Sequence, residues 1–237
     1  MDFSRIKASL KGKFWLDNPF YFICMFLDLE KDRIPLVLIC CGSFSPITFL
    51  HLRIFGMAPS GKALNWFLVV EIARDYFRNL KKFQVVGGII SPVSDGYGKE
   101  SLVSAEHRVE MCKLACEDNP LLTVDGWEAM NPSWTSTLQV LKHFKSEFDS
   151  ENLGQIRLCL LAGSDLLDGI DNPTIWNPNE VSELLDSFGI AVIERNPAVP
   201  LINKLFTSNV LYPHITNIFI ISQFVPNDVS SSKIRLL

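Results

Sequence analysis

Pro35-Leu-Val-Leu-Ile-Cys-Cys41 is an unbroken apolar run that ends directly before Gly42 and Ser43. A strand with one face in water alternates apolar and polar residues, whereas this run does not alternate. The pattern is typical of a strand that helices cover on both faces. We therefore expect it to lie at the centre of a parallel sheet.

Five further apolar runs resemble this one, and segments with helical periodicity separate them. The predicted strands after the first are residues 85–91, 121–124, 156–162, 189–194 and 215–221. The predicted helices are residues 104–117, 133–148, 179–187 and 201–211. This alternation predicts an α/β fold, with a doubly wound, Rossmann-like parallel sheet and helices on both faces. In such folds, ligands bind where strands end and helices begin.

The composition indicates a single globular domain. With 237 residues, 48% of them apolar, the chain is long enough to close a sizeable core. The net charge of −4, without a dense Lys/Arg cluster, argues against a nucleic-acid partner and leaves small anionic ligands open. The six cysteines show no paired C-x-x-C spacing, which argues against a zinc site or a disulfide framework and favours a reducing compartment.

Residues 1–34 form an N-terminal extension to which the sequence assigns no role. The longest clean apolar run in it, residues 21–27, is far too short to span a bilayer, so we expect no membrane span. Arg5 and nearby lysines leave an organelle-targeting presequence open, but Asp2 and later acidic residues favour an ordinary extension.

Residues able to bind an anion follow the first predicted strand. In Gly42-Ser-Phe-Ser-Pro-Ile-Thr-Phe-Leu-His51, a glycine turn leads into a predicted helix start, which exposes backbone N–H groups and the positive helix end. Thr48 and His51 are three residues apart and face the same side of the first turn. A Gly-Ser turn or a helical histidine alone is more often structural. Their joint occurrence after a buried strand favours a phosphate site.

The pattern G-S-F-S-P-x-T-x-x-H resembles the (H/T)-x-G-H-type signature of nucleotidyltransferases, in the variant typical of eukaryotic nicotinamide/nicotinate mononucleotide adenylyltransferases. Further segments resemble that family in the same order. They are Ser91-Pro-Val-Ser-Asp-Gly-Tyr-Gly-Lys99, Ser104-Ala-Glu-His-Arg108 with Asp125-Gly-Trp-Glu128, Gly163-Ser-Asp-Leu-Leu167 with Trp176, and Asn227-Asp-Val-Ser-Ser-Ser-Lys-Ile-Arg235. The resemblance implies a nucleotidyltransferase domain over residues 35–237.

The resemblance implies adenylyl transfer from ATP to nicotinamide or nicotinate mononucleotide in NAD biosynthesis, which yields NAD or its deamido form and pyrophosphate. It implies Mg²⁺ held mainly by the substrate phosphates, with no ligand from a protein side chain. The phosphate of the mononucleotide is largely ionised at neutral pH and needs no protein base, so positioning and charge neutralisation are expected to carry catalysis. Family members often form oligomers, and a homo-oligomer is open here. A cytoplasmic location is favoured, with nucleus and mitochondrion as alternatives.

The resemblance also implies roles for particular residues. The implied catalytic residues are His51, Lys99 and Arg235. The implied ATP contacts are Gly42, Ser43, Phe44, Thr48, Gly163, Asp165, Asn227, Ser230, Ser231 and Lys233. The implied mononucleotide contacts are Tyr97, Trp127 and Trp176, with the two indoles against the nicotinamide ring. Within this set, Asp165 is expected on the ribose, Asn227 near the adenine, and Lys233 with Arg235 on phosphate.

Each of these residue types also has an ordinary structural use. A lysine in a Gly-rich loop is usually solvated, and a tryptophan often packs in the core. An aspartate or a serine at a helix start is often a cap. The agreement of all the motifs in register favours the functional interpretation.

Two departures from the family pattern bear on activity. Residues 56–70 are fifteen extra residues that split the helix expected after His51, either as a looped-out insertion or as untranslated sequence retained in a gene model. The chain also stops at Leu237, where family members continue, so a truncated C-terminus is expected. The alternatives are a catalytically impaired member that binds nucleotide or protein, and another adenylyl- or cytidylyltransferase of the superfamily.

Overall fold

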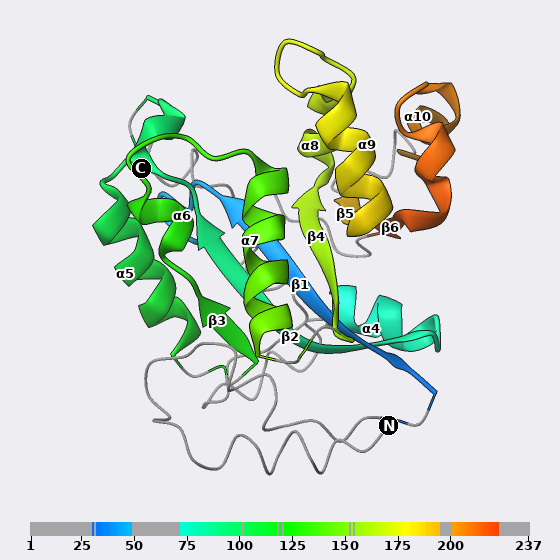
Figure 1. Ribbon diagram of the computed structural model, residues 1–237, viewed down its shortest axis with the longest axis horizontal. Helices are drawn as coiled ribbons and strands as arrows, with labels where there is room; N and C mark the ends of the chain where they lie inside the picture. The colour runs from blue at the N-terminus through cyan, green and yellow to red at the C-terminus, as the bar shows by residue number, and fades with distance from the viewer. Residues whose placement is uncertain are drawn as a thin grey trace.

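The computed structural model describes residues 30, 32–48, 72–100, 102–117, 119, 121–151, 153, 155–194 and 201–222. Within these residues the chain forms a six-stranded parallel sheet in the order β3-β2-β1-β4-β5-β6, with helices on both faces (Figure 1). The strands are β1 (Ile34–Gly42), β2 (Phe83–Pro92), β3 (Leu122–Val124), β4 (Arg157–Gly163), β5 (Ile190–Glu194) and β6 (Ile218–Ser222). The predicted doubly wound parallel sheet is confirmed.

The helices follow the strands in alternation, as the sequence predicts. They are α4 (Ile72–Asn79), α5 (Ala105–Cys116), α6 (Trp127–Met130), α7 (Thr137–Ser150), α8 (Ser164–Ile170), α9 (Pro178–Ser187) and α10 (Leu201–Thr207). Two 3₁₀ turns, η1 (Asp95–Tyr97) and η2 (Tyr212–Asn217), complete the described elements. The short helices α6 and α8 and the turn η1 lie directly after β3, β4 and β2, at positions where the sequence predicts loops.

β1 lies in the middle of the sheet, and its side chains enter two separate cores. Leu36 and Leu38 pack on the side of α4 and α5, whereas Val37 and Ile39 pack on the side of α7, α8 and α9. Figure 1 shows α7 lying in front of the strands near β1. Because both faces of β1 are covered, the strand has no polar alternation, which explains the unbroken apolar run from which it was predicted.

The start of α7 differs from the predicted helix start at residue 133. The Ser136 side chain accepts a hydrogen bond from the Gln139 N–H at 3.4 Å, and the Gln139 side chain accepts one from the Ser136 N–H at 3.2 Å. This reciprocal capping satisfies two backbone donors and fixes the first helical residue at Thr137. Residues 131–136 are therefore an irregular segment that leads into the helix.

The region predicted as one helix over residues 201–211 is divided. α10 ends at Thr207, and the Ser208 hydroxyl accepts hydrogen bonds from the N–H groups of Val210 and Leu211 at 3.2 and 3.1 Å. A serine hydroxyl that binds nearby backbone N–H groups competes with helical hydrogen bonding. The turn η2 follows, so β6 begins at Ile218 rather than at the predicted residue 215.

In the part of the chain that the structure describes, no helix is long and apolar enough to cross a membrane. The N-terminal extension up to residue 29, the extra block at residues 56–70 and the C-terminal residues 223–237 lie outside the described residues. Their predicted roles therefore stay predictions.

Gly189 offers a test of the turn that joins α9 to β5. Its φ is +76°, and a Cβ placed there would lie 2.7 Å from the backbone oxygen of Asn217. We expect Gly189→Ala to lower the free energy of unfolding by about 2 kcal/mol, because an L-residue is strained in this conformation and the contact is with backbone. Chemical denaturation measures the change.

Gly169→Ala in α8 is the matched control for that substitution. Its nearest neighbour, Nε1 of Trp176, would lie 3.8 Å from the new Cβ, which is an ordinary contact. Alanine favours a helix over glycine by up to about 1 kcal/mol, so this variant is expected to be as stable as the parent or more stable. Equal losses in both variants would contradict the assignment of strain to Gly189.

Candidate active site

The carboxyl ends of β1, β2 and β4 meet at one edge of the sheet. Gly42 at the end of β1 pairs with Pro92 at the end of β2, and the Val93 N–H donates to the Gly42 carbonyl at 3.0 Å. On the other side, Ile39 pairs with Leu160, three residues before β4 ends at Gly163. Strand order reverses between β1 and β4, which is where doubly wound sheets bind ligands. The structure thus brings the two glycines predicted to contact ATP to the same edge.

The loop after β1 begins at this edge and buries its aromatic ring. Phe44 has a φ of 41°, is 1% exposed and packs in the core on the side of α4 and α5. Its ring lies against Gly42, because a Cβ at Gly42 would be 3.2 Å from the Phe44 Cζ atom. Thr48 is also buried. The Phe44 ring is therefore not available to stack on a nucleotide. Ser43, Pro46 and Ile47 are the partly exposed residues among residues 43–48.

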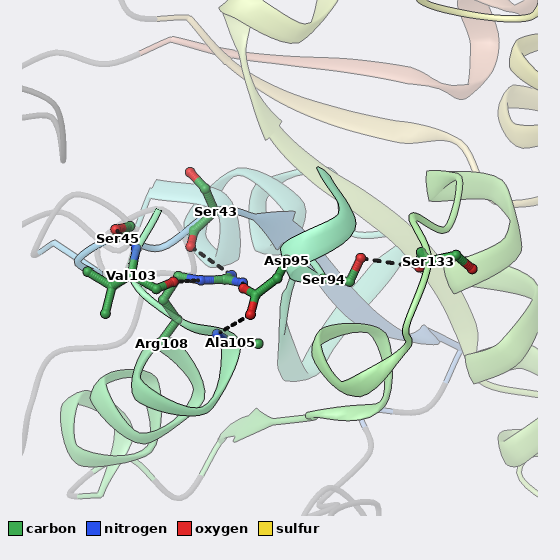
Figure 2. A network of polar contacts seen from close by, with 8 residues as sticks. All are labelled: Ser43, Ser45, Ser94, Asp95, Val103, Ala105, Arg108 and Ser133. Carbon is green, nitrogen blue, oxygen red and sulfur yellow. Dashed lines mark hydrogen bonds and ion pairs between the residues drawn. The ribbon is translucent and has the colours of Figure 1, made fainter. Parts of the chain in front are cut away.

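The turn after β2 carries the predicted mononucleotide and phosphate contacts. Tyr97 in η1 is half-exposed and Lys99 is exposed. Gly98 between them has a φ of 69°, a conformation that glycine adopts without strain. The turn packs against the segment before α7, since the Ser94 hydroxyl donates to the Ser133 carbonyl at 3.2 Å (Figure 2). Both predicted residues lie on or directly after a turn that is hydrogen-bonded to two other segments, the residues before α7 and the start of α5.

Asp165 lies in the first turn of α8, directly after β4. Gly163 occupies the N-cap position of this helix, so Asp165 is the second helical residue and its side chain is exposed. The alternative in which this aspartate is the N-cap is therefore wrong. Asp165 is therefore an exposed acidic residue beside the carboxyl end of β4.

The two predicted indoles have different surroundings. One face of the Trp127 ring stacks on the His143 ring of α7, with centroids 3.9 Å apart and planes 9° apart. Trp176 packs against the core on the side of α7 to α9, in the loop between α8 and α9 that Figure 1 shows beyond the tip of β4. A third indole, Trp134, is 52% exposed. Its backbone nitrogen would lie 2.9 Å from a Cβ at Gly96 in η1, so Trp134 lies beside the turn that carries Tyr97.

Arg108 of α5 is fully buried and makes three hydrogen bonds (Figure 2). Nε donates to the Val103 carbonyl at 2.8 Å, one terminal nitrogen donates to the Ser43 carbonyl at 3.1 Å, and the other contacts Oδ1 of Asp95 at 2.8 Å. Oδ2 of Asp95 accepts from the Ala105 N–H at 3.1 Å. These bonds, that from Arg108 first, lower the pKa of Asp95.

Glu128 of α6 is a second buried ionisable residue near this edge. It is 2% exposed, and one of its carboxylate oxygens accepts a hydrogen bond from the Ser91 hydroxyl at 2.5 Å. Burial raises the pKa of Glu128 to about 7, the charge of Asp125 adds to this, and the Ser91 hydrogen bond and the charge of Arg108 oppose it. Its carboxyl group therefore changes charge near neutral pH.

The remaining predicted residues lie outside the described part of the chain. They are His51, Asn227, Ser230, Ser231, Lys233 and Arg235. Among the described residues, no group of three or more His, Cys, Asp or Glu side chains could hold a metal ion.

Comparison with known proteins shows the family of the chain. The profile of the cytidylyltransferase-like family matches residues 39–237. A nicotinamide/nicotinic acid mononucleotide adenylyltransferase of Arabidopsis thaliana is 36% identical over 208 residues, which are 86% of this chain and 80% of that protein. A Bos taurus protein of the same name, numbered 1, is 31% identical over 87% of this chain and 81% of its own length. The chain belongs to the nicotinamide/nicotinic acid mononucleotide adenylyltransferase family.

This membership confirms the resemblance that the motifs predict. The similar Saccharomyces cerevisiae nicotinamide/nicotinic acid mononucleotide adenylyltransferase 1 is 38% identical over 219 residues, which are 88% of this chain and 50% of that protein. The chain spans about half the length of the yeast relatives it matches.

Three residues beside the candidate site were not predicted from the sequence as site residues. Arg108 and Glu128 lie within segments that resemble the family, and Asp95 lies in the segment that ends at Lys99. The signal that could have identified them is their position inside those motifs. The burial of Arg108 and Glu128, the contact of Arg108 with Ser43 and that of Glu128 with Ser91 depend on the fold and carry no local signature.

Proposed function

We propose that the chain transfers the adenylyl group of ATP to nicotinamide or nicotinate mononucleotide, giving NAD or its deamido form and pyrophosphate. The observation that carries the proposal is that Gly42 and Gly163 end the neighbouring parallel strands β1 and β4, where the strand order reverses, in a chain that belongs to this adenylyltransferase family. In a doubly wound sheet, ligands bind at the carboxyl ends of the strands where the strand order reverses.

ATP would lie over this edge. The backbone of Gly42, Ser43 and Phe44 would contact the phosphates, and the exposed carboxylate of Asp165 would accept hydrogen bonds from the ribose hydroxyls. By the motif agreement, His51, Ser230, Ser231, Lys233 and Arg235 would contact the phosphates, and Asn227 would lie near the adenine. Thr48 would support the loop from its buried position.

The mononucleotide would lie toward the turn after β2. Lys99 would contact its phosphate, with Tyr97 beside it, and Trp127 and Trp176 would hold the nicotinamide ring. Trp134 joins this group as a candidate, because it is half-exposed and its backbone lies against the turn that carries Tyr97. Trp127 has one ring face against His143, which leaves its other face for a ligand.

In the reaction, a phosphate oxygen of the mononucleotide attacks the α-phosphorus of ATP. The new P–O bond forms as the bond between the α-phosphorus and the α,β-bridging oxygen breaks, and pyrophosphate leaves with the electron pair. No protein base is required, because the attacking phosphate is already ionised. Donors and cations around the loop after β1 would neutralise the charge that develops on the phosphate oxygens. Mg²⁺, held mainly by the substrate phosphates, would add positive charge there. A cytoplasmic location and self-association stay predictions.

NAD formation by the purified chain tests the proposal directly. With ATP, Mg²⁺ and either mononucleotide, product is expected, and Lys99→Ala is expected to lower kcat/KM for the mononucleotide by about tenfold to a hundredfold. A hydrogen bond to a charged group is worth about 1.5–3 kcal/mol, which sets this range. Lys113→Ala, which removes an exposed lysine of α5, is the matched control and should leave kcat/KM unchanged.

Two outcomes would overturn the proposal. ATP binding without NAD formation would indicate an impaired family member, and transfer to a different phosphate acceptor in a substrate panel would indicate another nucleotidyltransferase. Equal activity of Lys99→Ala and the parent chain would remove Lys99 from the site.

A further inference from the structure

Arg108 is a fully buried cation. Its burial costs free energy of folding unless its N–H donors make hydrogen bonds. Taking a guanidinium out of water carries a penalty of several kcal/mol, which ion pairing and hydrogen bonds only partly offset. Here one carboxylate, that of Asp95, and two backbone carbonyls accept from it. An apolar residue of the same volume would fill the space without this penalty, so packing alone does not account for an arginine here.

The three acceptors come from three separate segments of the chain (Figure 2). Ser43 belongs to the loop after β1, Asp95 to the turn η1 after β2, and Val103 to the residues before α5. A second link joins the same segments, since the Val103 N–H donates to the Ser45 hydroxyl at 3.3 Å. The planar guanidinium, with five N–H donors in a fixed arrangement, sets the relative positions of all three segments.

Two of these segments carry the two halves of the proposed site. The loop with Ser43 would contact ATP, and the turn with Asp95 continues into Tyr97 and Lys99, which would contact the mononucleotide. Arg108 itself is 0% exposed, so it offers no surface to either substrate. We propose that Arg108 is a positioning residue that holds the ATP loop and the mononucleotide turn at a fixed separation. This inference rests on the proposed function.

Arg108→Lys tests the inference with the charge kept. A single ammonium group cannot replace three donors that point in different directions. The dissociation constants for ATP and for nicotinamide mononucleotide, each measured alone by calorimetry, are expected to rise severalfold. Because the reaction slows steeply when the reacting atoms are misplaced, kcat should fall by about 10- to 100-fold. Asp95→Asn keeps Arg108 but removes the carboxylate charge and replaces one of its two acceptor oxygens with an NH2 donor. It should shift binding and kcat in the same direction by less.

Glu106→Gln is the matched control, because it removes an exposed charge from the first turn of the same helix and should leave both affinities and kcat unchanged. A purely structural role for Arg108 would lower the melting temperature while the folded fraction kept its affinities and kcat, and that result overturns the inference. If the parent chain binds both nucleotides but makes no NAD, the proposed function fails, and the affinity changes still decide the role of Arg108. If the parent makes NAD and Arg108→Lys binds both nucleotides as tightly, the inference alone fails.

Discussion

Glu128→Gln is expected to raise the free energy of unfolding by up to about 3 kcal/mol at about pH 8, and to change it little below pH 4.5. Burial keeps the proton on Glu128 in the folded chain up to a pKa of about 7, whereas the unfolded chain releases it near 4.5. Between these values the folded state binds more protons, so stability falls as the pH rises and levels off above about 7. A pKa that moves from 4.5 to about 7 corresponds to roughly 3 kcal/mol.

Glutamine keeps the volume and can still accept the hydrogen bond from Ser91, but it does not titrate. Denaturant unfolding across this pH range therefore measures the effect of the charge alone. The charges of Arg108 and Asp125 act on Glu128, and Glu128 in turn raises the pKa of the Cys41 thiol. Glu106→Gln, on the exposed face of α5, should leave the pH dependence as it is in the parent chain. Parallel stability curves for Glu128→Gln and the parent through this window would show that Glu128 is already ionised when folded.

A carboxyl group whose ionisation is destabilising near neutral pH is unusual in a core, and such groups concentrate at functional sites. Glu128 lies directly after Trp127 and binds Ser91 near the end of β2, next to the proposed mononucleotide turn. Above pH 7 its negative charge would lie behind the proposed mononucleotide turn. If ionisation loosens the bond network around Ser91, the activity of the parent chain should change across the same pH range as its stability.

The sheet could be predicted from the sequence because its central strands are covered on both faces. In β1, and in β4 after Arg157, this leaves no polar side chains, and the runs stand out from the helical segments between them. The topology follows from the alternation and from right-handed crossovers. The predictions of element limits were wrong at Thr137 and Thr207, where the side chains of Ser136 and Ser208 decide the limits through local hydrogen bonds. Periodicity carries no information about such bonds.

The site could be predicted only where it coincides with strand ends. Gly42 and Gly163 lie at one edge because the neighbouring parallel strands β1 and β4 both end there, which is a property of topology. Arg108 could not be placed in this way, since an arginine in a helix normally reaches solvent and its burial requires acceptors from residues 43, 95 and 103. The environment of Trp127 likewise depends on His143, a contact between α6 and α7 with no pattern in the sequence.

His51→Ala is expected to lower kcat for NAD formation by about 10²–10³, the usual cost of losing one donor that stabilises transferring phosphate oxygens. The prediction rests on the motif, because His51 lies outside the described residues. Negative charge on these oxygens grows as the bond to pyrophosphate breaks, so the imidazole acts mainly in the transition state. The KM for ATP should therefore change far less than kcat. Steady-state kinetics with each substrate varied in turn measures both quantities.

His214→Gln is the matched control. His214 bridges Asp186 and Ser182 with its two ring nitrogens, at 2.7 and 3.0 Å, in the turn before β6. That turn lies at the amino end of its strand, opposite to the edge where Gly42 and Gly163 lie, so the control should keep kcat within about twofold even if stability falls. A loss confined to KM in His51→Ala would mean that the imidazole binds the ground state of ATP. An unchanged kcat would remove His51 from the reaction and, with it, the role proposed for the loop after β1 in neutralising the phosphate charge.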